Sequence, residues 1–301
     1  MKPDSKLAKK IESGDFIVTA ECAPGATATG ATAEAALKFL DGKVVAINLP
    51  DNSHGVAISS VAAAVAAIKL GAEPILQMVT RDRNRIALQS DLLGAASLGI
   101  KNLLCMSGYH QMLIGCPESA NVFDVDSSQF IDLATRMSEP GVLADGTKID
   151  GQFSMLVGAV ANPFLKPLDF NLFRLGIKIE AGARFIQTHA VFDLEAFSQW
   201  LDAVRKEGLT KKVAILAGVF PLGSAAEAQK LRDTYAEFRI PDKVIERLKK
   251  AGDDGAQKKE GLAICVETIK QLKALEGLRG IHILSGGKEA LVPEILAAAG
   301  L

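Results

Sequence analysis

Residues 74–107 read PILQMVTRDRNRIALQSDLLGAASLGIKNLLCMS and contain the unit from which the fold can be inferred. The apolar runs at 74–79 and 102–107 have the length and composition of strands that are buried on both faces. Between them, residues 85–99 carry apolar side chains at the 3.6-residue spacing of an amphipathic helix. Gly99 closes this segment, and glycine is the residue expected just past a helix C-terminus. The stretch therefore predicts a strand, a helix and a second strand parallel to the first.

The same unit recurs along the whole chain. Further apolar runs lie at 16–22, 43–49, 153–160, 184–190, 213–220 and 281–285, with helical patterns between them. Eight strand–helix units in 301 residues predict an α/β fold of one domain, residues 1–301, arranged as a (β/α)8 TIM barrel. A doubly wound open sheet is the alternative, because periodicity does not distinguish a closed sheet from an open one. Against it, the first strand is followed by APGATATGAT, which lacks the GxGxxG fingerprint.

The composition argues against several classes of partner. The net charge is −1, and no block of basic residues indicates nucleic acid binding. A single tryptophan and two tyrosines leave few rings on which bases could stack. No apolar run reaches the roughly 18 to 20 residues that a membrane span requires. The N-terminal stretch MKPDSKLAKKIESGDF predicts an amphipathic helix rather than a signal peptide, so we expect a cytoplasmic protein.

The cysteines give no indication of a metal site. Cys22, Cys105, Cys116 and Cys265 form neither a CxxC pair nor a Cys/His cluster at metal-ligand spacing. Cys22 and Cys105 lie in apolar runs, where a thiol packs as a small hydrophobic group. We therefore expect no bound metal and a reducing environment.

Polar residues gather where the predicted strands end, and in a TIM barrel these ends form the functional face. Residues at or just beyond the ends are Glu21, Asn48, Asp51, Asn52, Gln77, Ser107, Gly108, Tyr109, His110, Asn162, Gln187 and His189. Glu21 stands in the apolar run FIVTAEC, where burying an unpaired carboxylate would be costly. We interpret Glu21 as a functional carboxylate rather than a structural one.

Other polar residues admit a structural interpretation. The run 81–84, Arg-Asp-Arg-Asn, is equally consistent with a self-paired helix N-terminus in which Asp82 or Asn84 is the cap. His189 alone could be a core histidine with satisfied hydrogen bonds. His54 and His282 are interpreted as structural.

The combination of motifs is more specific than any one of them. In order, the chain contains VTAECAPG, INLPDN, GAEPILQMVTRDRNRIALQSDLLGAASLGIKNLLCMSG, FDVDS, EAGARFIQTHAVFD, ILAGVFPL and GIHILSGG. This series closely resembles methylenetetrahydrofolate reductases over essentially the whole chain, and most of all the bacterial branch with an RDRN segment. The resemblance implies a (β/α)8 barrel with FAD at its mouth. It also implies reduction of 5,10-methylenetetrahydrofolate to 5-methyltetrahydrofolate, a step of one-carbon metabolism and methionine biosynthesis, with NAD(P)H or another electron donor.

The resemblance also implies roles for individual residues. Glu21 matches the general acid that helps to open the methylene bridge to the iminium which accepts hydride. Asn48, Gln77, Ser107 and Gly108 match strand-end positions that line the flavin. Asn171 and Lys178 match positions that contact the ribose and the diphosphate of the cofactor. The resemblance further implies that the protein forms a homo-oligomer and works with an accessory subunit.

Two positions depart from the family pattern. Tyr109 stands where most members have an aspartate beside the flavin and the folate, and His189 stands where they usually have a folate-binding glutamine. Both are predicted to be altered flavin or folate contacts. The departures leave a second hypothesis open, a reductase-inactive paralogue. Such a protein would bind folate or another one-carbon ligand and act in methyl transfer or as a subunit of a complex. A different barrel enzyme is the remaining alternative.

Overall fold

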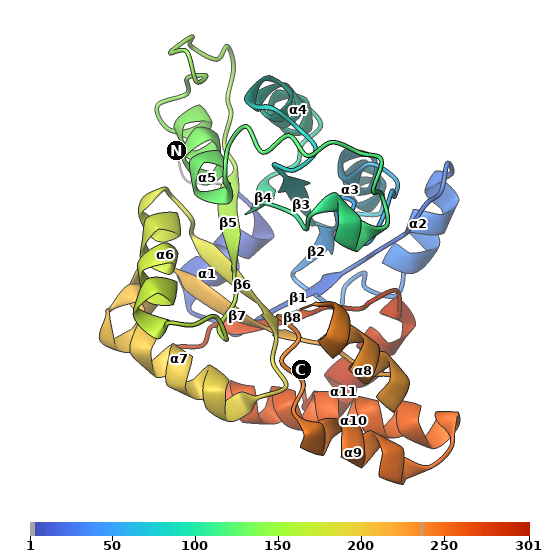
Figure 1. The fold of residues 1–301 in the computed structure, drawn as a ribbon. Coiled ribbons are helices and arrows are strands. Elements are labelled where there is room, and N and C mark those ends of the chain that lie inside the picture. The colour runs from blue at the N-terminus through green and yellow to red at the C-terminus, as the bar shows by residue number, and fades with distance from the viewer. Residues whose placement is uncertain (1–3, 236) are drawn as a thin grey trace.

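The computed structural model describes residues 4–235 and 237–301 and has eight parallel strands in a closed barrel (Figure 1). The strands are β1 (Ile17–Glu21), β2 (Ala46–Leu49), β3 (Pro74–Val79), β4 (Asn102–Met106), β5 (Leu156–Ala161), β6 (Phe185–Ala190), β7 (Ala214–Val219) and β8 (Gly280–Ile283). Each strand pairs with the next, and β1 pairs with β8 through the register Ile17↔Gly280. This last pairing closes the sheet, so the barrel prediction is confirmed and the open-sheet alternative is wrong.

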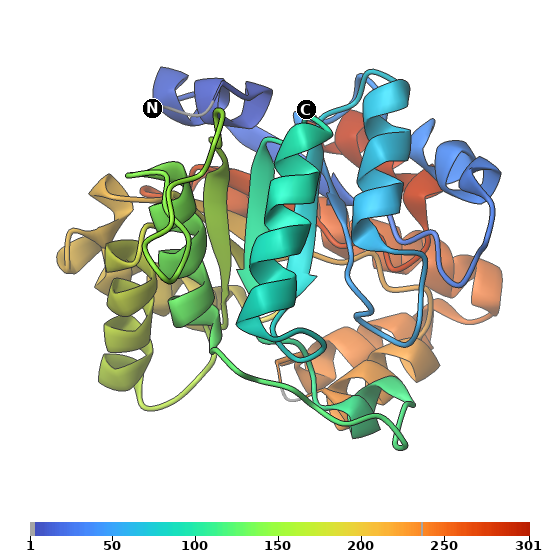
Figure 2. The same cartoon turned by 90° about the horizontal axis from the view of Figure 1, so that it is seen from above.

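Helices surround the barrel (Figures 1 and 2). They are α1 (Lys6–Ser13), α2 (Gly30–Leu37), α3 (Ser60–Lys69), α4 (Arg85–Ser97), α5 (Ser127–Ser138), α6 (Leu168–Glu180), α7 (Leu194–Lys206), α8 (Ala225–Thr234), α9 (Asp242–Ala251), α10 (Asp254–Lys273) and α11 (Val292–Ala299). The short 3₁₀ helices are η1 (Gln111–Ile114), η2 (Leu209–Lys211) and η3 (Glu289–Leu291). The β7–β8 connection carries α8, α9 and α10, where a simple strand–helix repeat would have one helix.

The unit from β3 to β4 forms as the sequence predicts, and its termini explain the RDRN run. Asn84 is the N-cap of α4, and its side chain accepts a hydrogen bond from the backbone N–H of Ala87 at 3.0 Å. Arg83 pairs with Asp51 at 2.6 Å and with Asp91 at 2.8 Å. Gly99 follows α4 with φ of 83°, a left-handed conformation that favours glycine. The interpretation as a self-paired helix N-terminus is confirmed for this part of the run.

The N-terminal end of the barrel is closed by α1, which lies opposite the long β4–α5 connection in Figure 2. Leu7 of α1 is buried in one apolar cluster with Ile17, Ile75 and Phe185 from the barrel interior. The Phe185 ring fills this space so completely that a Cβ at Gly158 would lie only 2.3 Å from it. The lower barrel is therefore a packed core, and open space is found at the other end.

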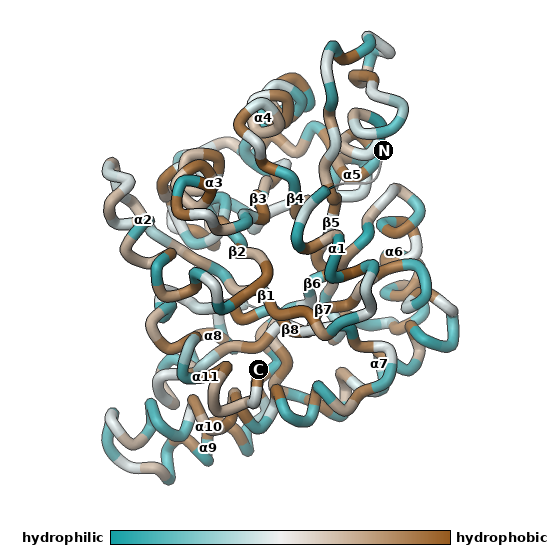
Figure 3. Tube along the Cα trace, turned by 180° about the vertical axis from the view of Figure 1, so that it is seen from behind, coloured by the Kyte–Doolittle hydropathy of each residue, from teal (hydrophilic) through white to brown (hydrophobic). Residues whose placement is uncertain are grey.

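A larger apolar layer lies between the strands and the outer helices. Its members include Met78, Phe130 and Trp200, all of them almost fully buried. Hydrophobic colour accordingly follows the strands in Figure 3, while hydrophilic segments lie on the outer helices and loops. Within the described residues, no helix combines the length and the apolar character needed to cross a membrane.

Candidate active site at the barrel mouth

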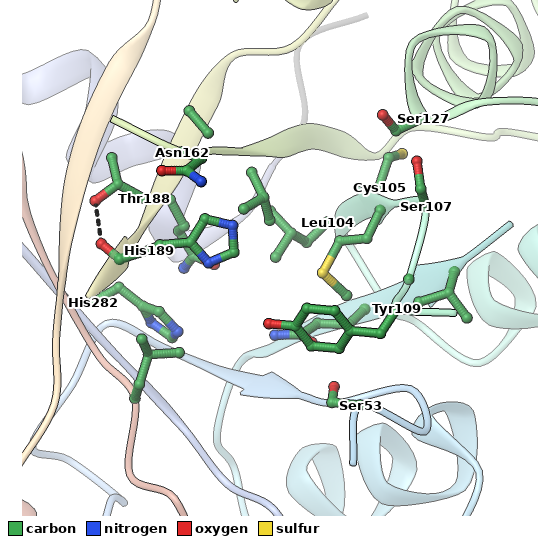
Figure 4. A pocket seen from close by; sticks show the side chains of 18 of the residues that line it. Ser53, Leu104, Cys105, Ser107, Tyr109, Ser127, Asn162, Thr188, His189 and His282 are labelled. Atoms are coloured by element: carbon green, nitrogen blue, oxygen red, sulfur yellow. Dashed lines mark hydrogen bonds between the residues drawn. The ribbon is translucent and has the colours of Figure 1, made fainter. Parts of the chain in front are cut away.

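A cavity of about 430 Å³ opens among the C-terminal ends of the strands. Its volume lies within the range of small-molecule sites. The residues to which the family resemblance gives a role line the cavity, with the exception of Asn48: they are Glu21, Gln77, Ser107, Gly108, Tyr109, Asn171, Lys178 and His189. Tyr109 and His189 extend into it from facing walls (Figure 4).

Asn48 lies in the barrel interior, in a polar layer of which Gln187 and His282 also line the cavity. Its side chain is fully buried, and its amide exchanges two hydrogen bonds with the amide of Gln187, at 2.6 and 3.0 Å. Gln187 also donates to the hydroxyl of Thr19 at 3.1 Å, and that hydroxyl lies 3.0 Å from Nδ1 of His282. The expected place of Asn48 on the flavin-lining wall is thus not found. Asn48 is fully buried and its amide is bonded to that of Gln187, so it does not form part of the cavity wall.

Glu21 is the last residue of β1 and lines the cavity. Burial raises the pKa of its carboxyl, the nearby Glu289 raises it further, and a backbone N–H of Gly286 partly offsets both effects. The resulting pKa is about 7. A carboxylic acid with this pKa can hold or release a proton near neutral pH, as a general acid must.

Tyr109, just beyond β4, belongs to a cluster of four side chains that we call the aromatic cluster: His54, Tyr109, Tyr235 and Glu237. The Tyr109 hydroxyl donates a hydrogen bond to Glu237, a carboxylate that is 8% exposed. His54 stacks against Tyr109 with ring centroids 6.2 Å apart, and its Nδ1 lies 3.1 Å from the Tyr235 hydroxyl. The rings of Tyr109 and Tyr235 are 5.1 Å apart. The cluster joins three connections across the mouth. Burial, and to a lesser extent the charge of Glu237, raises the pKa of Tyr109, so its phenol stays neutral.

Arg81 fixes the backbone next to this cluster. Its guanidinium is 1% exposed and pairs with Asp82 at 2.6 Å. It also donates to the backbone carbonyls of Tyr109 at 3.1 Å and Asn52 at 3.2 Å. Gly108 packs closely here as well, because it has φ of 84° and a Cβ would lie 3.1 Å from the side chain of Val79. Arg81 therefore combines a structural role with a place on the cavity wall.

The wall formed by α6 is positively charged. Lys178 donates a hydrogen bond to the backbone carbonyl of Val160 at 2.6 Å. Burial, and to a lesser extent the charge of Arg174, lowers the Lys178 pKa to about 8. Within the part of the chain that the structure describes, neither Lys178 nor Arg174 forms an ion pair with a carboxylate. Asn171 uses its side-chain N–H groups on the carbonyls of Asn162, at 2.8 Å, and Leu165, at 3.1 Å. This wall suits an anionic group of a ligand.

His189, in β6, faces the cavity from the side opposite Tyr109 (Figure 4). Burial lowers the pKa of its imidazole, while the charge of Glu237 acts in the opposite direction. The ring is therefore neutral at neutral pH and can both donate and accept a hydrogen bond. Such a group can bind a polar heterocycle such as a pterin.

Sequence reasoning missed some members of the site. Glu237 and Tyr235 follow α8, far from any strand end, and no local pattern indicates that they reach the mouth. His54 was interpreted as structural, but it lines the cavity and packs on Tyr109. Arg174 lies one helical turn before Lys178, so the i, i+4 spacing could have indicated it. His282 is buried and bonded to Thr19, as a structural residue would be, but it also lines the cavity.

Comparison with known proteins identifies the family. The family model described as methylenetetrahydrofolate reductase matches residues 6–300. The chain belongs to the methylenetetrahydrofolate reductase family. In the residues that the structure describes, no group of three or more His, Cys, Asp or Glu side chains is arranged to hold a metal ion.

Relatives within the family are distant. A probable methylenetetrahydrofolate reductase (NADPH) from Caenorhabditis elegans is 24% identical over 257 residues, which are 84% of this chain and 36% of the relative. The 5,10-methylenetetrahydrofolate reductase of Escherichia coli is 27% identical over 134 residues, which are 44% of each protein. The chain thus matches less than half the length of either relative.

Solved structures show the same fold. A Clostridium thermocellum protein, described as binding two copies of 5-methyl-5,6,7,8-tetrahydrofolic acid, superposes with a TM-score of 0.67 and 15% identity over 98% of both chains. A phosphonopyruvate hydrolase superposes with a TM-score of 0.51 and 14% identity, over 99% of this chain and 85% of that one. At these identities the likeness concerns the fold alone.

Proposed function

We propose that this protein is a flavin-dependent oxidoreductase that reduces 5,10-methylenetetrahydrofolate to 5-methyltetrahydrofolate, with Glu21 as the general acid. The observation that carries the proposal is a carboxyl group with a pKa of about 7 on the wall of the mouth cavity. Membership of the family supports the reaction class. The Clostridium thermocellum protein binds a reduced folate, and we infer the same class of substrate for this chain.

Glu21 would donate its proton to the substrate nitrogen that leaves when the methylene bridge opens. Near neutral pH about half of the Glu21 carboxyl groups hold that proton. Cys22 and His282 stay neutral at this pH, because burial raises the pKa of Cys22 to about 12 and lowers that of His282 to about 3. The cavity thus keeps a proton available beside the reacting bond.

FAD fits the charge distribution of the site. When bound, it supplies the hydride that reduces the opened bridge. Lys178 and Arg174 would hold its diphosphate. The diphosphate would supply the anionic partner that both cations lack among the described residues. Because both N–H groups of the Asn171 amide bond to the backbone, Asn171 can offer only its carbonyl oxygen to the ribose. Gln77, Ser107 and the backbone of Gly108 remain as groups for the flavin ring.

The pterin would lie between Tyr109 and His189. The neutral imidazole of His189 and the amide of Gln77 can pair with pterin nitrogen and carbonyl groups. We propose NAD(P)H or another electron donor as the reductant. A homo-oligomer, an accessory subunit and a cytoplasmic location follow the same family expectation.

Reduction of a bound flavin by 5-methyltetrahydrofolate tests the proposal. The purified protein is saturated with FAD under anaerobic conditions, and 5-methyltetrahydrofolate is added while flavin absorbance is followed. The oxidised-flavin absorbance should bleach as hydride leaves the methyl group. Glu21→Gln should bind FAD but bleach at least about 100-fold more slowly, whereas Glu246→Gln, an exposed position on α9, should behave as the wild type. Failure to take up FAD would contradict the proposal.

The aromatic cluster favours a second candidate, the reductase-inactive paralogue. The Tyr109 ring is tied to Glu237 and packed by His54 and Tyr235, and so it occupies part of the mouth. A protein of this kind would bind a folate or another one-carbon ligand without FAD and serve methyl transfer or a larger complex. Folate binding by calorimetry, without any uptake of flavin, would favour this candidate over the reductase.

A further inference from the structure

Glu289, a buried glutamate of η3, has no assigned role of its own in the function proposed above. It is 6% exposed, follows β8, and lies at the same end of the barrel as Glu21. Its Oε1 accepts hydrogen bonds from the backbone N–H of Ala23 at 2.9 Å and from the hydroxyl of Ser285 at 3.0 Å. Ala23 lies two residues beyond Glu21, so Glu289 is attached to the segment that carries the acid.

The two carboxyl groups have different surroundings. Both donors to Glu289 direct a hydrogen toward a single oxygen, an arrangement that suits a carboxylate. Among the described residues, a backbone N–H of Gly286 is the donor to Glu21, and burial and Glu289 both act against its charge. When two carboxyl groups share a poorly solvated region, the better hydrogen-bonded one carries the charge and the other takes the proton.

Other titratable groups near Glu21 do not supply a competing charge. Tyr109, Cys22, His54 and His282 are held neutral, each chiefly by burial. Lys288, the neighbour of Glu289 in sequence, points to Glu227 and pairs with it at 2.7 Å. Among the described residues, Glu289 is therefore the charged group that acts on Glu21.

We propose that Glu289 is a positioning residue whose fixed negative charge keeps Glu21 protonated. This role rests on the proposed acid function of Glu21 and adds a residue to it from the opposite end of the chain. Glu289 touches neither the substrate nor the cofactor, since it does not line the mouth cavity. Its effect would reach the reaction through the proton occupancy of Glu21.

The test is a direct titration of Glu21 in the purified protein, without flavin or folate. The protonated carboxyl band is followed by infrared spectroscopy against pH and assigned by its absence in Glu21→Gln. In Glu289→Gln the midpoint should fall by about one pH unit. At the wild-type midpoint, the protonated fraction of Glu21 would then fall about fivefold. Glu237→Gln is the matched control, because it removes another buried charge at the mouth and should leave the midpoint in place.

An unchanged midpoint in folded Glu289→Gln would overturn the proposal. If that variant does not fold, Glu289→Met removes the charge with a side chain of similar volume and should also lower the midpoint; no shift there would overturn the proposal equally. Because the titration needs no catalysis, its outcome is independent of whether the protein reduces folate. A wild-type midpoint near 4.5 would instead contradict the acid role of Glu21 itself.

Discussion

The hydroxyl of Tyr109 donates a hydrogen bond to the carboxylate of Glu237, a residue 128 positions further along the chain. This bond connects the end of β4 to the segment between α8 and α9. The resemblance to the family implies an aspartate at the position of Tyr109, whereas here the carboxylate beside the end of β4 belongs to Glu237, on a distant loop. A phenol ring separates this carboxylate from the strand end.

The first prediction concerns this bond. Tyr109→Phe should lower the free energy of unfolding by about 1–3 kcal/mol, because the buried Glu237 carboxylate loses its side-chain donor. Tyr235→Phe removes a hydroxyl from a more exposed pair with His54 and should cost less than about 1 kcal/mol. Urea unfolding of both variants measures the difference. Equal losses would show that the Tyr109 bond is no stronger than an exposed one.

A second prediction follows from the pKa of Glu21. Burial and Glu289 raise this pKa from 4.5 to about 7, so the native state favours the protonated acid. The stabilisation is complete below pH 4.5 and is lost as the pH rises through about 7. Glu21→Gln avoids this loss, so its stability relative to the wild type should rise by at most about 3 kcal/mol between about pH 5 and pH 8. Urea unfolding at several pH values should show this rise, and a difference that does not vary with pH would argue against a raised pKa.

Arg81 and Arg85 provide a matched pair for the third prediction. Both bind a neighbouring aspartate, but Arg81 is buried and serves two backbone carbonyls, whereas Arg85 and Asp124 lie at the surface. Arg81→Lys should lower the free energy of unfolding by about 3 kcal/mol, because lysine cannot reproduce the planar fork of donors. Arg85→Lys should cost under about 1 kcal/mol. Comparable costs in thermal or urea unfolding would contradict the structural role of Arg81.

The fourth prediction tests the α6 wall. Lys178→Met should weaken FAD binding by about 10-fold or more, since the diphosphate loses a buried cation. Lys206→Met, at the end of α7, keeps the wall intact and should bind as the wild type does. Flavin fluorescence titration at low and high salt measures both affinities. Unaltered affinity in Lys178→Met would place the diphosphate elsewhere.

The barrel could be predicted because its signal is local and repeats. Apolar runs such as 74–79 and helix ends such as Gly99 depend on neighbouring residues, and the observed strands and helix ends agree with them. Closure of the sheet into a barrel could be expected only from the number of strand–helix units. The pairing of Ile17 with Gly280 shows it directly. The additional helices between β7 and β8 do not follow from the strand–helix repeat, so the sequence did not indicate them.

The site could be predicted only in part. The end of a strand shows that a residue lies near the mouth of the barrel, but it does not show whether the side chain reaches the cavity. Glu21 ends its strand and lines the cavity, while Asn48, its partner in the β1–β2 register, is fully buried and does not line it. Contacts across loops, such as those of Tyr109 with Glu237, arise from tertiary packing between segments that share no sequence pattern. The presence of a tyrosine at position 109 was visible in the sequence, but the residue that accepts the hydrogen bond from its hydroxyl was not.

The polar layer of Asn48, Gln187, Thr19 and His282 also bears on how this protein can evolve. Each side chain is buried, and each bonds to another member drawn from a different strand. A substitution at one position leaves its neighbour without a partner in the core. We therefore expect these four positions to vary together among descendants of this sequence, as one inherited unit, and to constrain the mouth as well, because Gln187 and His282 line it.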